Sequence, residues 1–500
     1  MACWYNYSNF FQLQDGPMMN KVYVFLIFFT AAYLNGCATN PVTGEQDFVL
    51  MSEEQEISLG RKAHQQILQQ YSVYDDPALQ EYVSNLVDEL SSKSHRSELL
   101  FHVTVLDSPQ VNAFALPGGY VYVTRGIIAY MNSEAELAGV LGHEIGHVTA
   151  RHGVRQQSSA QVAGIFSTAV AIATGSREIA DATNIAGTAL IRGYGREHEL
   201  EADRLGAEYL AKVGYDPEEM INVVGILKSQ EDFDKQLAKE EGREPRAYHG
   251  TFSTHPSNDR RLQEVIRAAN KFRSGINRDN DGQFLKLTNG MTIGASEKDG
   301  VLRGNKFYHN DLDITLTFPQ GWKVDNLPDR LIAANKTKDA VMQITLRDLN
   351  KRQSPKEFIE SEFGNKLRNG QEVITESFKG YTAITKTKTP FGNQDTRIAA
   401  VFRDKQVYQF LAAAKDPASL EKHDKEFLAT VNSLRKLKSS ERSLAKSRKI
   451  KLVTAKKGDT FAKLAKSSPL SSHPEEQLRL LNGMYPEGEP VPGQLIKIVE

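Results

Sequence analysis

Apolar residues recur at helical spacing after residue 133, and signals for both ends of a helix flank them. Ser133 and Glu136 form a capping box, a pairing that begins many helices. Arg151 and His152 suit a last turn because positive charge opposes the helix dipole there, and Gly153 is typical just beyond a helix. The pattern predicts a helix with one apolar face toward the core. That face comprises Leu137, Val140, Leu141, Ile145 and Val148.

Two segments near this helix also carry clear patterns. Residues 120–124 alternate as a strand does, and Gly118-Gly119 before them supplies turn geometry, so a strand, a turn and a second strand are predicted. Residues 162–174 are apolar and small. They are too few to cross a bilayer, which takes about 20 residues, so we expect a buried helix or one that covers a cleft.

The hydrophobic pattern changes between residues 307 and 437, where apolar and polar residues begin to alternate. Strands are predicted at Asp311–Phe318 and Ala340–Leu346 and a hairpin at Ile398–Ala412. Ser354 and Pro355 begin a helix, and a further helix runs to Leu434. The segment has no cluster of His, Cys or paired acids, so we interpret it as a small α+β binding or docking module of unknown ligand.

The whole chain is thus predicted to be a multidomain α+β protein. The first domain should begin its folded part at Ser52-Glu-Glu-Gln, another capping box, and end after a helix at 260–272. The predicted order is a signal segment 1–37, a mainly helical domain with a small sheet 38–273, a linker with short strands 274–306, the α+β module 307–437, a basic linker 438–449 and a last domain 450–500.

The N-terminus predicts export and a lipid anchor. Residues 22–34 are apolar, follow Lys21 and are too short to cross a bilayer, as in a signal peptide. Leu34-Asn-Gly-Cys37 resembles a bacterial lipobox, so Cys37 would become the first mature residue and carry lipid, with residues 1–17 an over-extended start. Ala38 after the cysteine would imply the outer membrane. The alternatives are an ordinary cleaved signal, which leaves a soluble periplasmic protein, and an uncleaved anchor.

Composition adds limits rather than a function. Hydrophobic residues make up 40% and charged residues 25%, which is ordinary for a globular body, and 500 residues allow about three domains. The net charge of −1 gives no reason to expect a nucleic-acid partner. Of the two cysteines, Cys3 and Cys37, only Cys37 would outlast removal of the signal, so no disulfide is expected.

The strongest chemical signal is His143-Glu-Ile-Gly-His147. Residues four apart share one face of a helix, so the two imidazoles can bind one Zn²⁺. Glu144 lies beside them, where its carboxylate can take a proton from a water at the metal, as in zincin peptidases. His152 lies about 140° further round the helix than His147, so we expect it to be a C-terminal charge and not a ligand.

A catalytic zinc needs a third protein ligand, and residues 195–206 offer several acids. Glu199 and Asp203 are four apart and share a helix face, so one could bind the metal while the other orients a ligand histidine. Spacing alone does not choose Glu199 over Glu201. A solvated acidic helix face is the alternative.

These two motifs resemble those of the M48 family of zinc metallopeptidases. The resemblance implies one Zn²⁺ per chain held by His143, His147 and Glu199, with Glu144 as general base and Asp203 orienting the ligands. Gly195 stands where the family usually has Ser. A stretch at 112–126 is also similar to the family's strand, turn and strand before the metal helix.

The resemblance implies two further roles. The edge strand would pair with an extended substrate, largely without regard to its sequence, through Asn112, Ala113, Phe114 and Ala115. His255 precedes a proline, where the family often has His-Pro near the cleft. It would either donate to the developing oxyanion or bind zinc as a blocking fourth ligand. A structural hydrogen bond at a helix entry is the alternative.

Residues 450–500 resemble a LysM domain, a family that binds N-acetylglucosamine polymers such as peptidoglycan. The similar segments are Ile450–Val453, Gly458–Phe461, Leu464-Ala465, Leu481–Gly483 and Pro492–Ile498, in the implied order strand, helix, helix and strand. A domain of this fold that binds no glycan and acts as a packing cap is the alternative.

Taken together, the sequence predicts a zinc endopeptidase of the lipoprotein branch of M48, on the periplasmic face of the outer membrane of a Gram-negative bacterium. Its substrates would be misfolded or misassembled envelope proteins. One alternative is a scaffold that binds unfolded chains and peptidoglycan while His255 keeps the zinc site closed. Another is a peptidase that acts on peptidoglycan cross-links.

Overall fold

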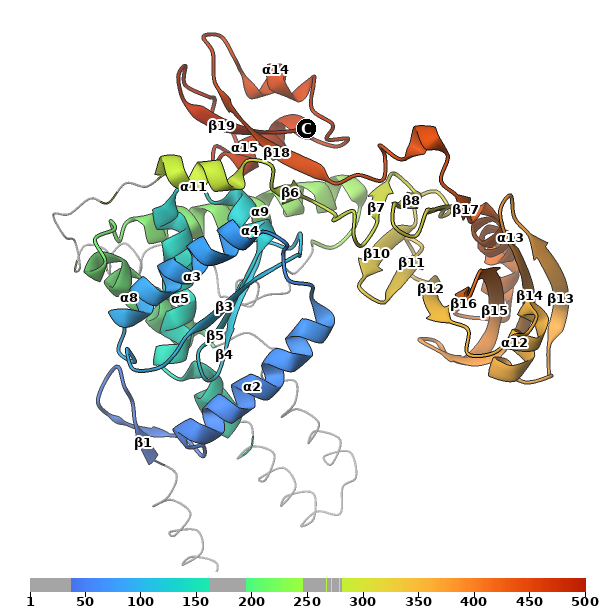
Figure 1. Cartoon of the computed structure of the whole chain (residues 1–500), viewed down its shortest axis with the longest axis horizontal. Coiled ribbons are helices and arrows are strands. Elements are labelled where there is room, and N and C mark those ends of the chain that lie inside the picture. Colours follow the sequence, from blue (N-terminus) through green and yellow to red (C-terminus); the bar gives the residue numbers. More distant parts are fainter. Residues whose placement is uncertain are drawn as a thin grey trace, which may run out of the picture.

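A computed structural model shows that the chain is a mixed α+β protein, as expected, with helices and strands in its first and last parts and mainly strands in its middle part (Figure 1). The structure describes residues 37–159, 161, 195–245, 267, 271, 278 and 281–500. The predicted signal segment before residue 37, the apolar segment 162–174, His255 and most of the helix 260–272 lie outside the described residues.

The first part of the chain builds a three-stranded sheet between helices. Its strands lie in the order β3-β5-β4, with β3 parallel and β4 antiparallel to β5. The sheet's strands are β3 (His102–Leu106), β4 (Ala113–Leu116) and β5 (Tyr120–Thr124), and a short hairpin β1 (Cys37–Thr39) and β2 (Gln46–Phe48) precedes them. The helices are α2 (Glu53–Gln70), α3 (Pro77–Ser92), α4 (Arg125–Tyr130), α5 (Glu134–Thr149), α8 (Arg196–Lys212) and α9 (Glu219–Glu241).

The predicted strand, turn and strand before the metal helix are confirmed as β4 and β5. Gly118 and Gly119 in the turn have φ of +77° and +89°, a region that side chains disfavour. Every residue of β5 is buried, because alternate side chains face opposite layers. Val121 packs with the helical core and Tyr122 with α2. The sheet is therefore covered on both faces.

Helix α5 begins as predicted and ends earlier than predicted. Ser133 accepts a hydrogen bond from Glu136 N at 2.9 Å, while the Glu136 carboxylate accepts from Asn132 N. The helix ends at Thr149, and Arg151 takes a left-handed φ of +55°. The chain then turns into a second helical stretch at 152–159. The expectation of Gly153 as the residue after the helix was wrong.

Small residues let α5 and α8 approach closely. A Cβ added at Gly146 would lie 3.0 Å from the Ala202 carbonyl oxygen, and one at Gly206 would lie 3.1 Å from His143 N. Both distances are shorter than ordinary van der Waals contact with backbone atoms. The glycines thus bring the backbones of the two motif-bearing helices together.

The middle part has its own core. Its seven-stranded sheet has the order β10-β11-β12-β16-β15-β14-β13, and a four-stranded sheet has the order β17-β9-β8-β7. The predicted capping box at Ser354 is confirmed at α12 (Pro355–Phe363), and α13 (Pro417–Ser433) is the second predicted helix. The strands are β7 (Val301–Arg303), β8 (Lys306–His309), β9 (Ile314–Thr317), β10 (Lys323–Leu327), β11 (Arg330–Ala334), β12 (Ala340–Asp348), β13 (Arg368–Ile374), β14 (Lys379–Thr389), β15 (Gly392–Arg403), β16 (Gln406–Ala414) and β17 (Arg435–Lys436).

The C-terminal part follows the predicted order of strand, helix, helix and strand. Its sheet has the order β19-β18-β6, so a strand from before the middle part completes it. The expected linker also contains a helix, α11, whose Phe284 is fully buried in the main core. The elements are α11 (Asp281–Thr288), β6 (Thr292–Ile293), β18 (Arg448–Thr454), α14 (Phe461–Ala465), α15 (Pro474–Leu481) and β19 (Leu495–Val499).

This C-terminal part shares its hydrophobic core with the first part. Phe461 and Leu478 belong to the same buried cluster as Ile128 and Val140. Lys497 on β19 is fully buried, and its Nζ donates to the carbonyl oxygens of Ala129 at 2.8 Å, Leu481 at 3.4 Å and Met131. The ammonium group thus binds carbonyls at the C-terminal ends of α4 and α15, where helix dipoles favour positive charge.

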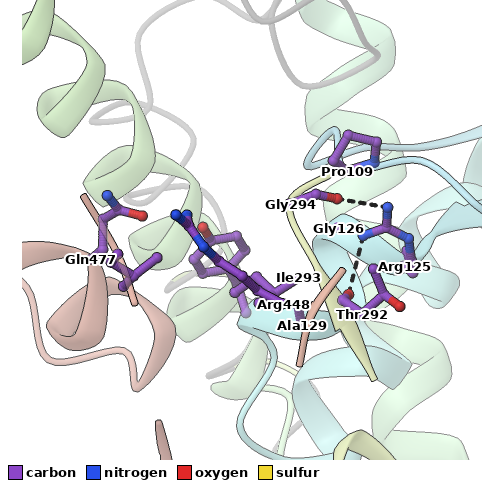
Figure 2. Close-up of a pocket in the computed structure, with 11 residues that line it drawn as sticks. Pro109, Arg125, Gly126, Ala129, Thr292, Ile293, Gly294, Arg448 and Gln477 are labelled. Carbon is purple, nitrogen blue, oxygen red and sulfur yellow. Dashed lines mark hydrogen bonds between the residues drawn. The ribbon is translucent and has the colours of Figure 1, made fainter. Parts of the chain in front are cut away.

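A second buried cation, Arg125, ties β6 to the first part. Figure 2 shows its guanidinium donating to the Thr292 and Gly294 carbonyl oxygens, at 3.1 and 2.7 Å, beside a cavity of about 130 Å³. Its Nε donates to Asp107 at 2.5 Å. Arg448 of β18 also lines this cavity, so three segments distant in sequence meet there.

Among the residues described, none of the helices is both long and apolar enough to cross a bilayer.

Candidate metal centre

The two motifs place three possible metal ligands together between α5 and α8. His143 Nε2 and His147 Nε2 are 3.0 Å apart. Glu199 Oε2 lies 3.4 Å from the first and 3.6 Å from the second. All three side chains are buried, and among the described residues they form a cluster able to hold a metal ion.

This donor set fits zinc. With bonds of about 2.0–2.1 Å, neighbouring donors of a tetrahedral zinc lie about 3.3 Å apart, which the three separations bracket. Two imidazoles and one carboxylate are a ligand set found at catalytic zinc sites, which leave one position for water or substrate. The arrangement therefore has the chemistry and the spacing that a catalytic zinc requires.

Asp203 lies on the outer side of His143. Asp203 Oδ1 is 2.8 Å from His143 Nδ1. Asp203 follows Glu199 by about one turn of α8. Burial opposes the charged imidazole, but hydrogen bonds to Asp203 and Glu199 outweigh it and raise the pKa of His143 to about 9. A place that attracts a proton this strongly also attracts a metal cation. The carboxylate in addition directs His143 Nε2 inward.

The first turn of α8 departs from the family pattern at Gly195. This residue is the N-cap, and it offers no side-chain hydrogen bond to the helix. Glu197 and Glu199 lie in the first turn, where negative charge is favourable. The departure affects the cap and leaves the position of Glu199 intact.

Glu144 is fully buried on α5, next to His143 in the chain. The predicted substrate strand β4 is at the edge of the sheet, and its Phe114 ring stacks on Tyr122 at 4.7 Å. Asn112, Ala113 and Ala115 are buried. These positions are compatible with the expected roles, which the structure itself does not test.

The side chains of two expected functional residues, Cys37 and His255, are outside the part of the chain that the structure describes. Cys37 begins β1, and its side chain is outside the described residues. His255 is outside them altogether. Their roles stay predictions.

The expectation that His152 is a charge at the end of α5 was wrong. The residue is fully buried, and burial lowers its pKa to about 4. Its Nδ1 lies 2.8 Å from His147 Nδ1, and its Nε2 lies 3.0 Å from Glu201 Oε2. The left-handed turn at Arg151 redirects the chain, so a helical projection could not place His152.

Comparison with known proteins agrees with the geometry of the site. The model of peptidase family M48 matches residues 77–269. The beta-barrel assembly-enhancing protease of Escherichia coli is 29% identical over 269 residues, which are 51% of this chain and 52% of that protein. The mitochondrial metalloendopeptidase OMA1 of Schizosaccharomyces pombe is 27% identical over 230 residues, or 45% of this chain and 64% of that protein.

The chain thus spans about half the length of the Escherichia coli relative. A solved structure of cyanobacterial PsbP from Synechocystis covers 27% of this chain and 95% of its own at 9% identity, with a TM-score of 0.22, too slight a likeness to carry an argument. The match over residues 77–269 includes both motifs of the metal centre, and this part of the chain is similar to peptidase family M48.

Proposed function

We propose that this protein is a zinc-dependent endopeptidase. The observation that carries the proposal is the buried triangle of His143, His147 and Glu199, with donor separations of 3.0 to 3.6 Å. The family match over residues 77–269 supports it.

The proposed chemistry assigns a task to each residue. His143, His147 and Glu199 would hold the zinc, which when bound lowers the pKa of water and polarises a carbonyl. Glu144 accepts the proton of the attacking water on its carboxylate and then delivers it to the departing amine. Asp203 keeps the His143 ring oriented.

The edge strand β4 supplies a place for substrate. An extended peptide that adds to a sheet edge is bound mainly through backbone hydrogen bonds, with little demand on its sequence. Residues 112–115 would receive it, a mode that selects unfolded or exposed segments. His255 would act near the same cleft, either as a donor to the oxyanion or as a fourth ligand that keeps the site closed.

For substrates and location we propose misfolded or misassembled proteins of the bacterial envelope. One relative is named for enhancing beta-barrel assembly. A lipid on Cys37 would hold the enzyme at the periplasmic side of the outer membrane, attached directly to the hairpin β1–β2. The LysM-like C-terminal part would contact peptidoglycan, or serve only as a packing cap.

The proposal is tested on the purified chain and its Glu144→Gln variant. We expect one zinc per chain in both, and casein cleavage by the wild type that a chelator abolishes. In Glu144→Gln cleavage should fall by about 10²–10⁴-fold, because the base is lost and the ligands are kept.

The matched control is Glu197→Gln, which changes an exposed acid in the first turn of α8 and should leave cleavage unchanged. A wild type without bound zinc, or a Glu144→Gln variant that cleaves casein normally, would contradict the proposal. Normal function of that variant in cells would favour the scaffold instead.

A further inference from the structure

The two ligand histidines are supported differently on their outer sides. His143 faces the carboxylate of Asp203, the usual partner of a metal-bound imidazole. His147 Nδ1 faces another imidazole instead, that of His152, at 2.8 Å. His152 in turn reaches Glu201 Oε2 with its Nε2 at 3.0 Å. The carboxylate of Glu201 therefore supports His147 indirectly, through the imidazole of His152.

His147, His152 and Glu201 form a series of hydrogen bonds, and the metal at one end and the carboxylate at the other determine where its protons lie. A ligand that binds metal through Nε2 is neutral and keeps its hydrogen on Nδ1, so His147 donates to His152 Nδ1. His152 then has its hydrogen on Nε2 and donates it to the Glu201 carboxylate, which only accepts. These tautomers satisfy both contacts of His152, and they direct the lone pair of His147 Nε2 toward the position of the metal.

Neighbouring side chains hold His152 and Glu201 in place. The His198 ring stacks on His152 with centroids 4.3 Å apart and planes at 16°. Arg155 Nη1 donates to Glu201 Oε2 at 3.2 Å, and its Nε lies 3.3 Å from Asp47 Oδ2 in β2. The support of the metal ligand thus extends to the N-terminal hairpin.

The intervening ring also makes electrostatic sense. Glu199, Asp203 and Glu144 already bring three carboxyl groups into the buried site. A further carboxylate directly on His147 would add negative charge where desolvation is costly. Glu201 instead lies at 18% side-chain exposure and is paired with Arg155.

We propose that His152 and Glu201 are positioning residues that fix the tautomer and the ring orientation of His147 for metal binding, with Arg155 and Asp47 anchoring them to the hairpin β1–β2. The inference rests on the proposed zinc centre. It adds His152, which the helical spacing had set aside as a ligand, and Glu201, which the spacing had left open.

The test measures zinc affinity by competition with a chromophoric chelator, using the full chain and three variants. His152→Leu removes both contacts and should weaken zinc binding about 10–100-fold. Glu201→Gln keeps the shape and loses the charge, so a smaller loss is expected. His152→Asn places an amide oxygen near the position of Nδ1 and should restore most of the affinity.

Glu208→Gln is the matched control. Glu208 lies on the same helix at 13% side-chain exposure and is paired with Lys212 at 2.9 Å, away from His152. It should bind zinc as the wild type does. Melting temperatures of the metal-free proteins check that each variant folds, and Glu201→Gln against Glu208→Gln decides the case if His152→Leu does not fold.

The outcomes separate this inference from the proposed function. A wild type that binds zinc tightly, together with His152→Leu and Glu201→Gln variants that bind it equally well, overturns the positioning role and leaves the zinc centre standing. Equal losses in Glu201→Gln and Glu208→Gln, or no rescue by His152→Asn, also overturn it. A wild type that binds no zinc removes the proposed function itself.

Discussion

Lys497 illustrates how much one buried side chain can matter to this molecule. Its ammonium group lies where the C-terminal part meets the first part, hydrogen-bonded to carbonyl oxygens of both. Burial lowers its pKa to about 7, partly offset by the nearby Glu136. Since lysine in an unfolded chain has a pKa of about 10.4, the unfolded protein holds the proton more tightly.

The stability of the protein should therefore rise with pH between about 7 and 10.4. In that window the unfolded chain binds more protons than the folded one, so raising the pH favours the folded state by up to about 1.4 kcal/mol per unit. Urea unfolding of the wild type and of Lys497→Met at several pH values measures the difference between them. Lys451→Met, at an exposed lysine of β18, is the matched control. A pH-independent difference would mean that the carbonyls keep the lysine charged.

At the metal centre, the sequence predicted which side chains would lie close together. The i, i+4 spacing placed His143 and His147 correctly on one helix face, and the resemblance selected Glu199, which the structure brings to them. Glu201, left open by spacing, faces His152 instead. That contact could not be predicted, because it depends on the left-handed turn at Arg151.

At the scale of elements, the distance between α5 and α8 sets the size of the donor triangle. Gly146→Ala should destabilise the protein by about 1–3 kcal/mol, since the new methyl group meets backbone atoms of Ala202 that cannot rotate away. Zinc affinity should fall with it as the helices separate. Thermal unfolding and the chelator competition measure the two effects.

Gly225→Ala in α9 is the matched control. A Cβ there meets nothing within 4 Å, so helix propensity alone should stabilise the protein by about 0.5–1 kcal/mol. If Gly146→Ala were stabilising to the same degree, the tight approach of α5 and α8 would be refuted.

Helices and strands could be predicted where the sequence showed a clear alternation of apolar and polar residues or a complete turn or cap signal. The hairpin of β4 and β5 has both turn glycines and an alternating strand, and α12 has a complete capping box. By contrast, six of the seven residues of β13 are exposed, so the strand shows no apolar alternation to detect. The two residues of β6 are too few for any periodic signal.

At the scale of the molecule, the middle part is inserted into the C-terminal part. Strand β6 precedes it and β18 follows it, and the two pair with each other, Ile293 opposite Arg448. The middle part has separate hydrophobic cores, while the segments on either side of it share the core of the first part. The sequence order alone suggested three consecutive domains.

Removal of the middle part should therefore leave the rest folded. Joining Ile293 to Arg448 through Asn-Gly makes a two-residue hairpin of the favoured type. We expect the shortened protein to be monodisperse, to bind one zinc and to cleave casein at a rate within about threefold of the full chain. Aggregation, or loss of zinc, would contradict the insertion. Cutting the chain after Ser447 instead should prevent folding, because it removes Phe461 and Leu478 from the main core.

The pairing of β6 with β18 has a further consequence for how this chain could be recombined. Any exchange of its last fifty residues with those of a relative would have to carry α11 and β6 along, although some 150 residues intervene in the gene. A swap that begins near residue 450 would leave the transferred module without β6, its third strand, and would leave the β6 of the recipient without a partner strand. The unit that can be exchanged is therefore defined by the strands that share a sheet, and not by a continuous stretch of sequence.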